Sequence, residues 1–491
     1  MTNIARALIA TAGATVSETY WASSVRITTT TVSGESIGDA TNSACQFGEG
    51  GNIIQCISSN SEGAAEGDFA AYIVRLDPTD GSLIGTERYL ETGEDHWFRQ
   101  DCPAFYHPTM DKVIIRIRGW WDGSANFENG VAVINTSGTT DTVLSNVDDN
   151  PTAGDGNYLV CFVNDQATMS FYNPSTGAVS AGEEQPYDDM TAFSVWASTD
   201  SSAMVISGRY PTNIQRIIKI SQSTSGFGGD TAVRDLPGPT SQALDNNNST
   251  RSKLMDSSGT IYGFSTWNYT TLFQVYGTSL ENYKQIQYTT QSSYNLLGVS
   301  TKTNRSSMVL VGDSVYQSVP VIFRKVGDSY NSVMYPIFQI STSTFQVTAC
   351  LGVMSDAGAE YADSYSGVLE SNAEETCLYL SYIHTKINNR GGESDKVLKL
   401  PLDLTTIPNQ NLNFNSTHDD IYIWDFWDTT TGGAYPVYSE LFQAISYQGE
   451  TGTYARTIVE GTPTTTTPVK ETGNSPVSRT LLAEDVEITT T

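Results

Sequence analysis

Short apolar and β-branched runs alternate along the chain with segments rich in Gly, Asn, Ser and Thr. Runs of this length and composition predict β-strands. Seven of them are followed, after a loop, by a second apolar run that leads into a turn, which predicts seven strand pairs. The first strands are expected at 51–58, 112–119, 157–163, 203–209, 259–265, 307–313 and 377–383, and their partners at 70–77, 130–136, 168–174, 215–221, 271–277, 321–327 and 396–403.

The strand pairs recur at a spacing that is typical of one propeller blade. Between the marker positions Ile54, Val113, Leu159, Met204, Ile261, Met308 and Leu378 the steps are 59, 46, 45, 57, 47 and 70 residues. Blades take roughly 40 to 50 residues, and insertions lengthen their loops. Turn sequences that contain Gly follow three of the partner strands, at 76–82, 134–139 and 172–178. We therefore predict an all-β protein, a β-propeller of seven blades.

A string of two or three β-sandwiches is the alternative, because sandwiches also combine short strands with frequent turns. Sandwich domains should be separated by linkers rich in Pro, Gly and Ser. The one candidate inside the array, residues 235–250, fits equally well as a long surface loop. A propeller accounts for the length better, since a closed ring of blades leaves only short sheet edges.

Three segments lie outside the strand pairs. Residues 1–19 predict a short helical docking segment with Ile4 and Leu8 on its apolar face, and residues 20–459 form the expected propeller. Residues 418–428 predict a strand with two apolar faces, which either closes the ring or docks another subunit through Trp424 and Trp427. Residues 460–491 form an extended Thr/Pro-rich tail that ends in a short apolar run with Leu481 and Leu482. We expect a neighbouring subunit to hold this tail.

Charge restricts the partners of the chain. The 491 residues include 54 Asp and Glu against 26 Lys and Arg, a net charge of −28. A nucleic-acid partner is not expected, because binding to phosphates needs clustered cations. Neither is membrane insertion, because no apolar run approaches about 20 residues. The first residues, with one Arg and an apolar stretch interrupted by Thr11 and Gly13, are not typical of a secretion signal.

Catalytic and metal-binding patterns are weak. The chain has no nucleophile elbow, P-loop or dinucleotide fingerprint between a strand and a helix. Glu94/Asp95 and Asp419/Asp420 are carboxylate pairs of the type that glycosidases use, but solvated loop acids explain them better. Turn chemistry likewise accounts for residues 146–157 better than a calcium loop does. We predict no enzymatic activity, no catalytic residue, no metal and no cofactor.

Two aromatic pairs are candidates for stacking on a glycan or receptor. Trp120 and Trp121, and Trp267 and Tyr269, stand where strands are expected to meet loops. Packing between blades is the competing interpretation. The six cysteines are sparse, and those at 56, 161 and 377 interrupt apolar runs, which predicts small buried thiols. A disulfide between Cys45 and Cys56 across a hairpin is also possible.

The first predicted blade, residues 34–90, resembles the repeats of tail-associated β-propeller proteins of marine tailed bacteriophages. The resemblance rests on "FGEGGNIIQC" and "VRLDPTDGSL" within this blade, and on "MDSSGTIYGF" at residues 255–264. It implies a virion structural protein in a tail fibre, tip or adhesion assembly, which forms a homo-oligomer, contacts other tail subunits and attaches to a host-surface glycan or protein. A secreted or surface propeller that binds or cleaves polysaccharide is the alternative.

Overall fold

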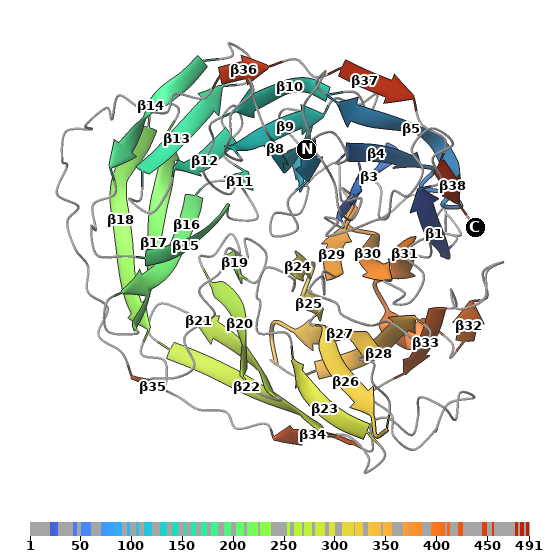
Figure 1. Cartoon of the computed structure of the whole chain (residues 1–491). Coiled ribbons are helices and arrows are strands. Elements are labelled where there is room, and N and C mark those ends of the chain that lie inside the picture. The colour runs from blue at the N-terminus through green and yellow to red at the C-terminus, as the bar shows by residue number, and fades with distance from the viewer. Residues whose placement is uncertain are drawn as a thin grey trace, which may run out of the picture.

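The computed structural model describes strands and the short turns that join some of them. The described residues are 20–27, 43–46, 51–59, 70–90, 96–98, 105–107, 112–119, 128–134, 140–145, 152–153, 159–163, 168–173, 178–184, 191–197, 203–210, 214–223, 226–236, 253–255, 260–267, 270–276, 280–289, 294–299, 307–318, 320–327, 332–344, 347–355, 367–372, 374–384, 394–407, 410–412, 421–425, 444–448, 454–455, 477–479, 482–485 and 488–490. Within these ranges the strands form seven sheets, and the helical content is one 3-10 turn, η2 (Leu404–Thr406). The sheets stand around a common centre (Figure 1), so the chain is a β-propeller.

Five sheets are built mainly from strands that follow one another in the chain. The first contains β2 (Ser43–Gln46), β3 (Ile53–Ser59), β4 (Ala70–Leu76) and β5 (Leu83–Leu90); the second contains β6 (His96–Phe98), β7 (Phe105–His107), β8 (Lys112–Gly119), β9 (Glu128–Ile134) and β10 (Thr140–Ser145). The third contains β11 (Thr152–Ala153), β12 (Leu159–Val163), β13 (Thr168–Asn173) and β14 (Ala178–Glu184). The fourth contains β15 (Thr191–Ala197), β16 (Ala203–Tyr210), β17 (Ile214–Ser223) and β18 (Gly226–Leu236), and the fifth contains β19 (Lys253–Met255), β20 (Ile261–Trp267), β21 (Thr270–Tyr276) and β22 (Leu280–Thr289).

The last two sheets take strands from more distant parts of the chain. The sixth contains β23 (Tyr294–Val299), β24 (Ser307–Val311), β25 (Ser314–Ser318), β26 (Val321–Lys325), β27 (Ser332–Ser341), β28 (Val347–Ser355), β32 (Gln410–Leu412) and β33 (Ile421–Asp425). The seventh joins β29 (Gly367–Ser371), β30 (Cys377–His384) and β31 (Ser394–Pro401) to β1 (Trp21–Ile27). The expected number of seven blades stays a prediction, because the sixth sheet alone has eight strands.

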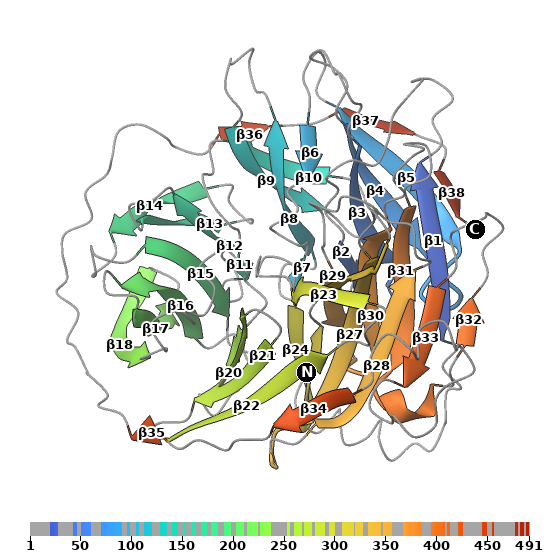
Figure 2. The same cartoon turned by 60° about the horizontal axis from the view of Figure 1, so that its bottom comes forward.

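Contacts between the innermost strands of neighbouring sheets order the ring. β2 contacts β29 and β7, β15 contacts β11 and β19, and β24 contacts β19 and β29. These strands surround the centre of the molecule, and the later strands of each sheet lie farther out (Figures 1 and 2). Most of these innermost strands are short, and the pattern of apolar runs predicted none of them except β24.

Six of the seven predicted strand pairs are hydrogen-bonded neighbours in the structure: β3 with β4, β8 with β9, β12 with β13, β16 with β17, β20 with β21, and β30 with β31. The seventh pairing, of 307–313 with 321–327, is wrong. β24 pairs with β25 instead, because Gly312 and Asp313 form a two-residue hairpin turn in which Gly312 has a φ of 54°. The strand at 321–325 pairs with β23 and β27.

The N-terminal strand closes the ring. β1 pairs antiparallel with β31 over Trp21–Val25, so the outer part of the last sheet comes from the start of the chain (Figures 1 and 2). Residues 418–428 were expected either to close the ring or to dock another subunit, and the first of these interpretations is wrong. Their described part, β33, pairs with β28 and β32 in the sixth sheet.

The end of the chain lies on the outer edges of the sheets (Figure 1). β34 (Ala444–Gln448) and β35 (Tyr454–Ala455) pair with β22, β36 (Val477–Arg479) with β10, β37 (Leu482–Asp485) with β5, and β38 (Ile488–Thr490) with β1. The described strands of the predicted tail are therefore paired within their own chain and need no neighbouring subunit to hold them. The expected helix in residues 1–19 lies outside the described residues.

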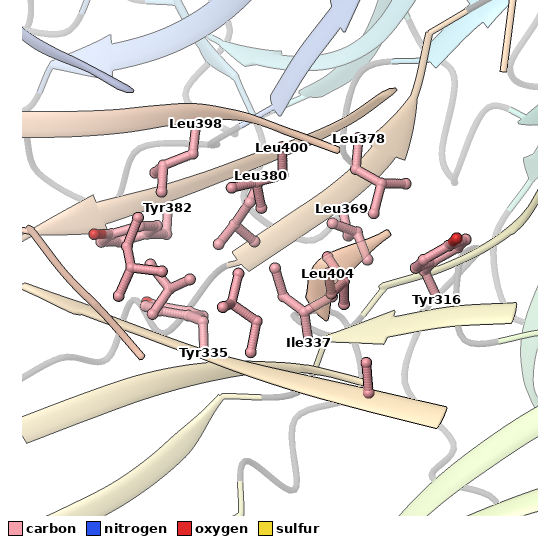
Figure 3. Close-up of a cluster of buried hydrophobic side chains, with 14 of the residues drawn as sticks. Tyr316, Tyr335, Ile337, Leu369, Leu378, Leu380, Tyr382, Leu398, Leu400 and Leu404 are labelled. Atoms are coloured by element: carbon pink, nitrogen blue, oxygen red, sulfur yellow. The ribbon is translucent and has the colours of Figure 1, made fainter. Parts of the chain in front are cut away.

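Large apolar side chains fill the space between the sixth and seventh sheets. Tyr335 and Ile337 of β27 face Leu380 and Tyr382 of β30, and the rings of Tyr335 and Tyr382 stack with centroids 4.6 Å apart (Figure 3). Both faces of these strands are buried, which explains why their apolar runs are nearly continuous. Cys377 is fully buried and is a thiol rather than part of a disulfide, which confirms the prediction.

Candidate functional site

The best-defined polar cluster of the described residues lies where the ring closes. It joins the closing strand β1 to residues 77–82, the turn between β4 and β5 of the first sheet, which we call the closure turn. This turn follows from its own sequence: Asp77 Oδ1 accepts a hydrogen bond from the Thr79 amide at 2.7 Å, and Asp80 Oδ1 accepts one from the Ser82 amide at 2.9 Å. Gly81 has a φ of 74°, as predicted for a turn that reverses the chain.

Three side chains of the seventh sheet donate hydrogen bonds to carbonyl groups of the closure turn. The indole Nε1 of Trp21 and the Nζ of Lys399 both reach the Pro78 carbonyl oxygen, at 3.1 and 3.2 Å. Ser23 Oγ donates to the Gly81 carbonyl oxygen at 2.6 Å, and Ser23 is buried. The first and last parts of the ring are thus held together by polar contacts as well as by strand pairing.

Apolar contacts fix the same cluster. The Trp21 ring lies 6.2 Å from the Tyr379 ring of β30, at an interplanar angle of 46°. A Cβ atom on Gly81 would overlap the Trp21 ring and come within 2.5 Å of Ser23 Oγ. Glycine is required here for the close approach of the two segments as well as for its backbone conformation.

The Asp80 carboxylate of the closure turn lies on the solvent side. Asp80 is exposed, and hydrogen bonds from Ser82, first from its hydroxyl and then from its amide, lower the pKa of Asp80 below its usual value of 3.8. This carboxylate stabilises the turn in its ionised form. The cluster as a whole holds backbone segments in place, and its carbonyl acceptors are already occupied.

A second polar contact ties the sixth sheet to the connection after β31. Tyr316 Oη donates to the Leu402 carbonyl oxygen at 2.8 Å, next to Asp403, which caps η2 by accepting from the Thr405 amide at 3.1 Å. Burial raises the pKa of Tyr316. Its phenol is therefore a hydrogen-bond donor throughout the neutral range.

Two buried glutamines were not predicted as special positions. Gln55 lies on β3 and Gln317 on β25, both fully buried, and neither side-chain amide has a hydrogen-bond partner in the described structure. An unsatisfied buried amide costs about 1–3 kcal/mol. Each glutamine interrupts an apolar run, which is the sequence signal that could have found them.

Three of the predicted contact residues lie in the part of the chain that the structure describes. Trp267 is the last residue of β20, Trp424 lies in β33, and Leu482 is the first residue of β37. These three positions are on different sheets. The other candidates lie outside the described residues: Ile4, Leu8, Trp120, Trp121, Tyr269, Trp427 and Leu481, as do the carboxylate pairs Glu94/Asp95 and Asp419/Asp420.

The described part of the chain offers neither a metal site nor a membrane-spanning helix. It holds no group of three or more His, Cys, Asp or Glu side chains that could bind a metal ion. Among the same residues, no helix has the length and apolar character that crossing a bilayer takes.

The chain is similar in fold to several solved β-propellers. The Cps50 (Swd1) propeller domain of Myceliophteria thermophila is 8% identical, with 76% of this chain and 99% of that one covered and a TM-score of 0.38. The Dos1 propeller is 9% identical, with 73% and 95% covered and a TM-score of 0.32. A neuraminidase-like protein of subtype N11 from A/flat-faced bat/Peru/033/2010 is 13% identical, with 80% and 100% covered and a TM-score of 0.32. No protein-family model and no curated protein matches the sequence, so these likenesses concern the fold alone.

Proposed function

We propose that this propeller is a non-enzymatic structural protein of a tailed-bacteriophage virion, located in the tail as part of a fibre, tip or adhesion assembly. Its partners are other tail subunits, including further copies of itself, and a host-surface glycan or protein. The resemblance of residues 34–90 to tail-associated propellers supports this role. In this role the chain acts without a cofactor, without nucleic acid and without insertion into a membrane.

One observation of the structure carries the proposal furthest. The outer edges of the sheets accept short extended segments in antiparallel pairing, as β36 pairs with β10 and β37 with β5. Addition of a strand to an exposed sheet edge is a general way in which proteins bind extended peptides. A rim of such edges suits a subunit that must be joined to several others.

Mass spectrometry of purified particles tests the role directly. We expect peptides of this chain in the particles in whole-number proportion to a tail protein, and antibodies against its loops should label the tail in electron micrographs. Absence of the polypeptide from particles that carry all their other tail proteins would overturn the proposal.

A polysaccharide-binding propeller is the second candidate. It is supported by the position of Trp267 at the end of β20, where two residues connect this strand to β21. A glycan array probed with the full chain and with Trp267→Ala tests it. Retention of one glycan that this substitution reduces at least tenfold would favour this function, with Trp424→Ala as the matched control.

A further inference from the structure

Three strands at the end of the chain follow the rim of adjacent sheets. β36 lies on the second sheet, β37 on the first and β38 on the seventh (Figure 1). Only residues 480–481 separate β36 from β37, and only residues 486–487 separate β37 from β38. We call these three strands the C-terminal belt. The belt crosses the boundary between the first and last sheets of the ring.

Each contact of the belt is short and depends mainly on backbone pairing. β36, β37 and β38 have three, four and three residues. The register sets Leu482 opposite Leu90 and Glu484 opposite Arg88. These are matched residue types at paired positions, apolar with apolar and acidic with basic, which favours antiparallel pairing at this edge.

We infer that the belt also binds the rim of a second copy of this chain, so that subunits are joined by exchange of belts. The rim and the belt are the same in every copy, so an exchanged belt makes every contact that it makes within one chain. Strands of three or four residues at a sheet edge open readily, because few hydrogen bonds hold each of them. Exchange therefore needs no unfolding of a sheet.

Chain length sets the concentration at which exchange begins. Residues 456–476, 21 in number, separate β35 on the fifth sheet from β36 on the second. Segments joined by a short flexible linker meet at an effective concentration of about a millimolar, and longer linkers lower this value. When the protein concentration reaches this effective concentration, or a lower one, pairing of the belt with a second copy should be as frequent as pairing within one copy. A second copy of the chain is one of the partners in the proposed function, and the exchange rests on that proposal.

Cross-linking of two single-cysteine additions tests the exchange. Ala483 of β37 is the register partner of Tyr89 of β5. The full-length variants Ala483→Cys and Tyr89→Cys are purified separately, mixed at about 0.1 or about 1 mM and oxidised mildly, and the linked peptides are identified by mass spectrometry. Neither variant can form this link alone, so the link reports a belt on another copy. A second pair, Thr489→Cys with Arg26→Cys, tests exchange of β38 onto β1 in the same way. It replaces the first pair if one of those variants does not fold.

The matched control mixes Ala483→Cys with Ser180→Cys, which lies on β14, the outer strand of the third sheet. We expect the 483–89 link to exceed the control and to rise up to about tenfold from about 0.1 to about 1 mM, since its formation is bimolecular. The double variant Ala483→Cys/Tyr89→Cys can form the link within its own chain and shows that the two positions are close enough to react. If it links while both mixed pairs stay at the control yield, the inference is overturned. Because the assay uses purified protein, its result does not depend on whether the chain is found in virions.

Discussion

Replacement of Gly81 by alanine tests whether the closure turn holds the closing strand. Gly81 has a φ of 74°, where an L-residue costs about 1–2 kcal/mol. The new Cβ would also overlap the Trp21 ring and crowd Ser23 Oγ. Both side chains would have to move, and their hydrogen bonds to Pro78 and Gly81 would weaken, each worth about 1 kcal/mol. We expect a total loss of about 3 kcal/mol at the ring closure.

Gly312→Ala is the matched control. Gly312 also has a positive φ, 54°, but a Cβ at this position would meet no atom within 4 Å. The control therefore carries the backbone cost alone, about 1 kcal/mol. The difference between the two variants, about 2 kcal/mol, measures the contacts of the closure turn with β1.

Native-state hydrogen exchange, read on peptides that cover residues 21–25, is the appropriate assay, because it reports local opening of β1. A difference of about 2 kcal/mol corresponds to roughly 30-fold faster exchange in Gly81→Ala than in Gly312→Ala. Equal exchange of β1 in the two variants would refute the reasoning, since it would mean that the close approach at Gly81 contributes nothing to closure.

Three further substitutions test the polar contacts one at a time. Ser23→Ala removes the buried hydrogen bond to the Gly81 carbonyl and should cost about 1 kcal/mol in denaturant unfolding, whereas the exposed control Ser343→Ala should cost clearly less. Equal effects would argue against the contact. Asp80 has a lowered pKa, so its ionised form stabilises the turn above pH 3.8 and this contribution is lost as the pH falls through the lowered pKa. Asp80→Asn should therefore lose less thermal stability than the wild-type chain between about pH 5 and pH 2.5, and parallel curves would contradict this. Tyr316 has a raised pKa, so its contribution is present below pH 10 and lost as the pH rises through the raised pKa. Tyr316→Phe should cost about 1 kcal/mol at neutral pH and flatten the loss of stability above pH 10, and an unchanged alkaline profile would exclude the phenol as the cause.

The positions of the longer strands were predictable, because the run of apolar residues that indicates a strand lies within the strand itself. Ile53 and Ile54 lie on opposite faces of β3, and both are fully buried in the structure. The first strands of the sheets, such as β6 with three residues and β11 with two, were missed because so short a strand has no periodicity to detect. The pairing error at 307–313 has a similar origin, since one Gly decides between a tight hairpin at Gly312 and a longer connection.

The ring closure was not predictable, because it joins the two ends of the chain. Turn chemistry identified Gly81 as a residue with positive φ, but nothing in the local sequence connects it with Trp21 or Ser23. The same holds for Lys399, which lies in an alternating strand and reaches Pro78 only because β1 brings the first and last sheets together. The aromatic residues predicted to contact a glycan or receptor were chosen for loop positions, whereas Trp21 acts from within a strand.

The distance along the chain explains why so many contacts gather at this closure. The hydrogen bond from Lys399 to Pro78 joins residues 321 positions apart. Closing a loop of that length costs about 5 kcal/mol in entropy beyond a constant term, and a single polar contact contributes only about 1 kcal/mol. The five-residue pairing of β1 with β31, the three donors to the closure turn, and the strands β37 and β38 on either side of the boundary together offset this cost. Since the N-terminal strand and the C-terminal belt are placed at one boundary, the structure uses both ends of the chain where closure is entropically most expensive.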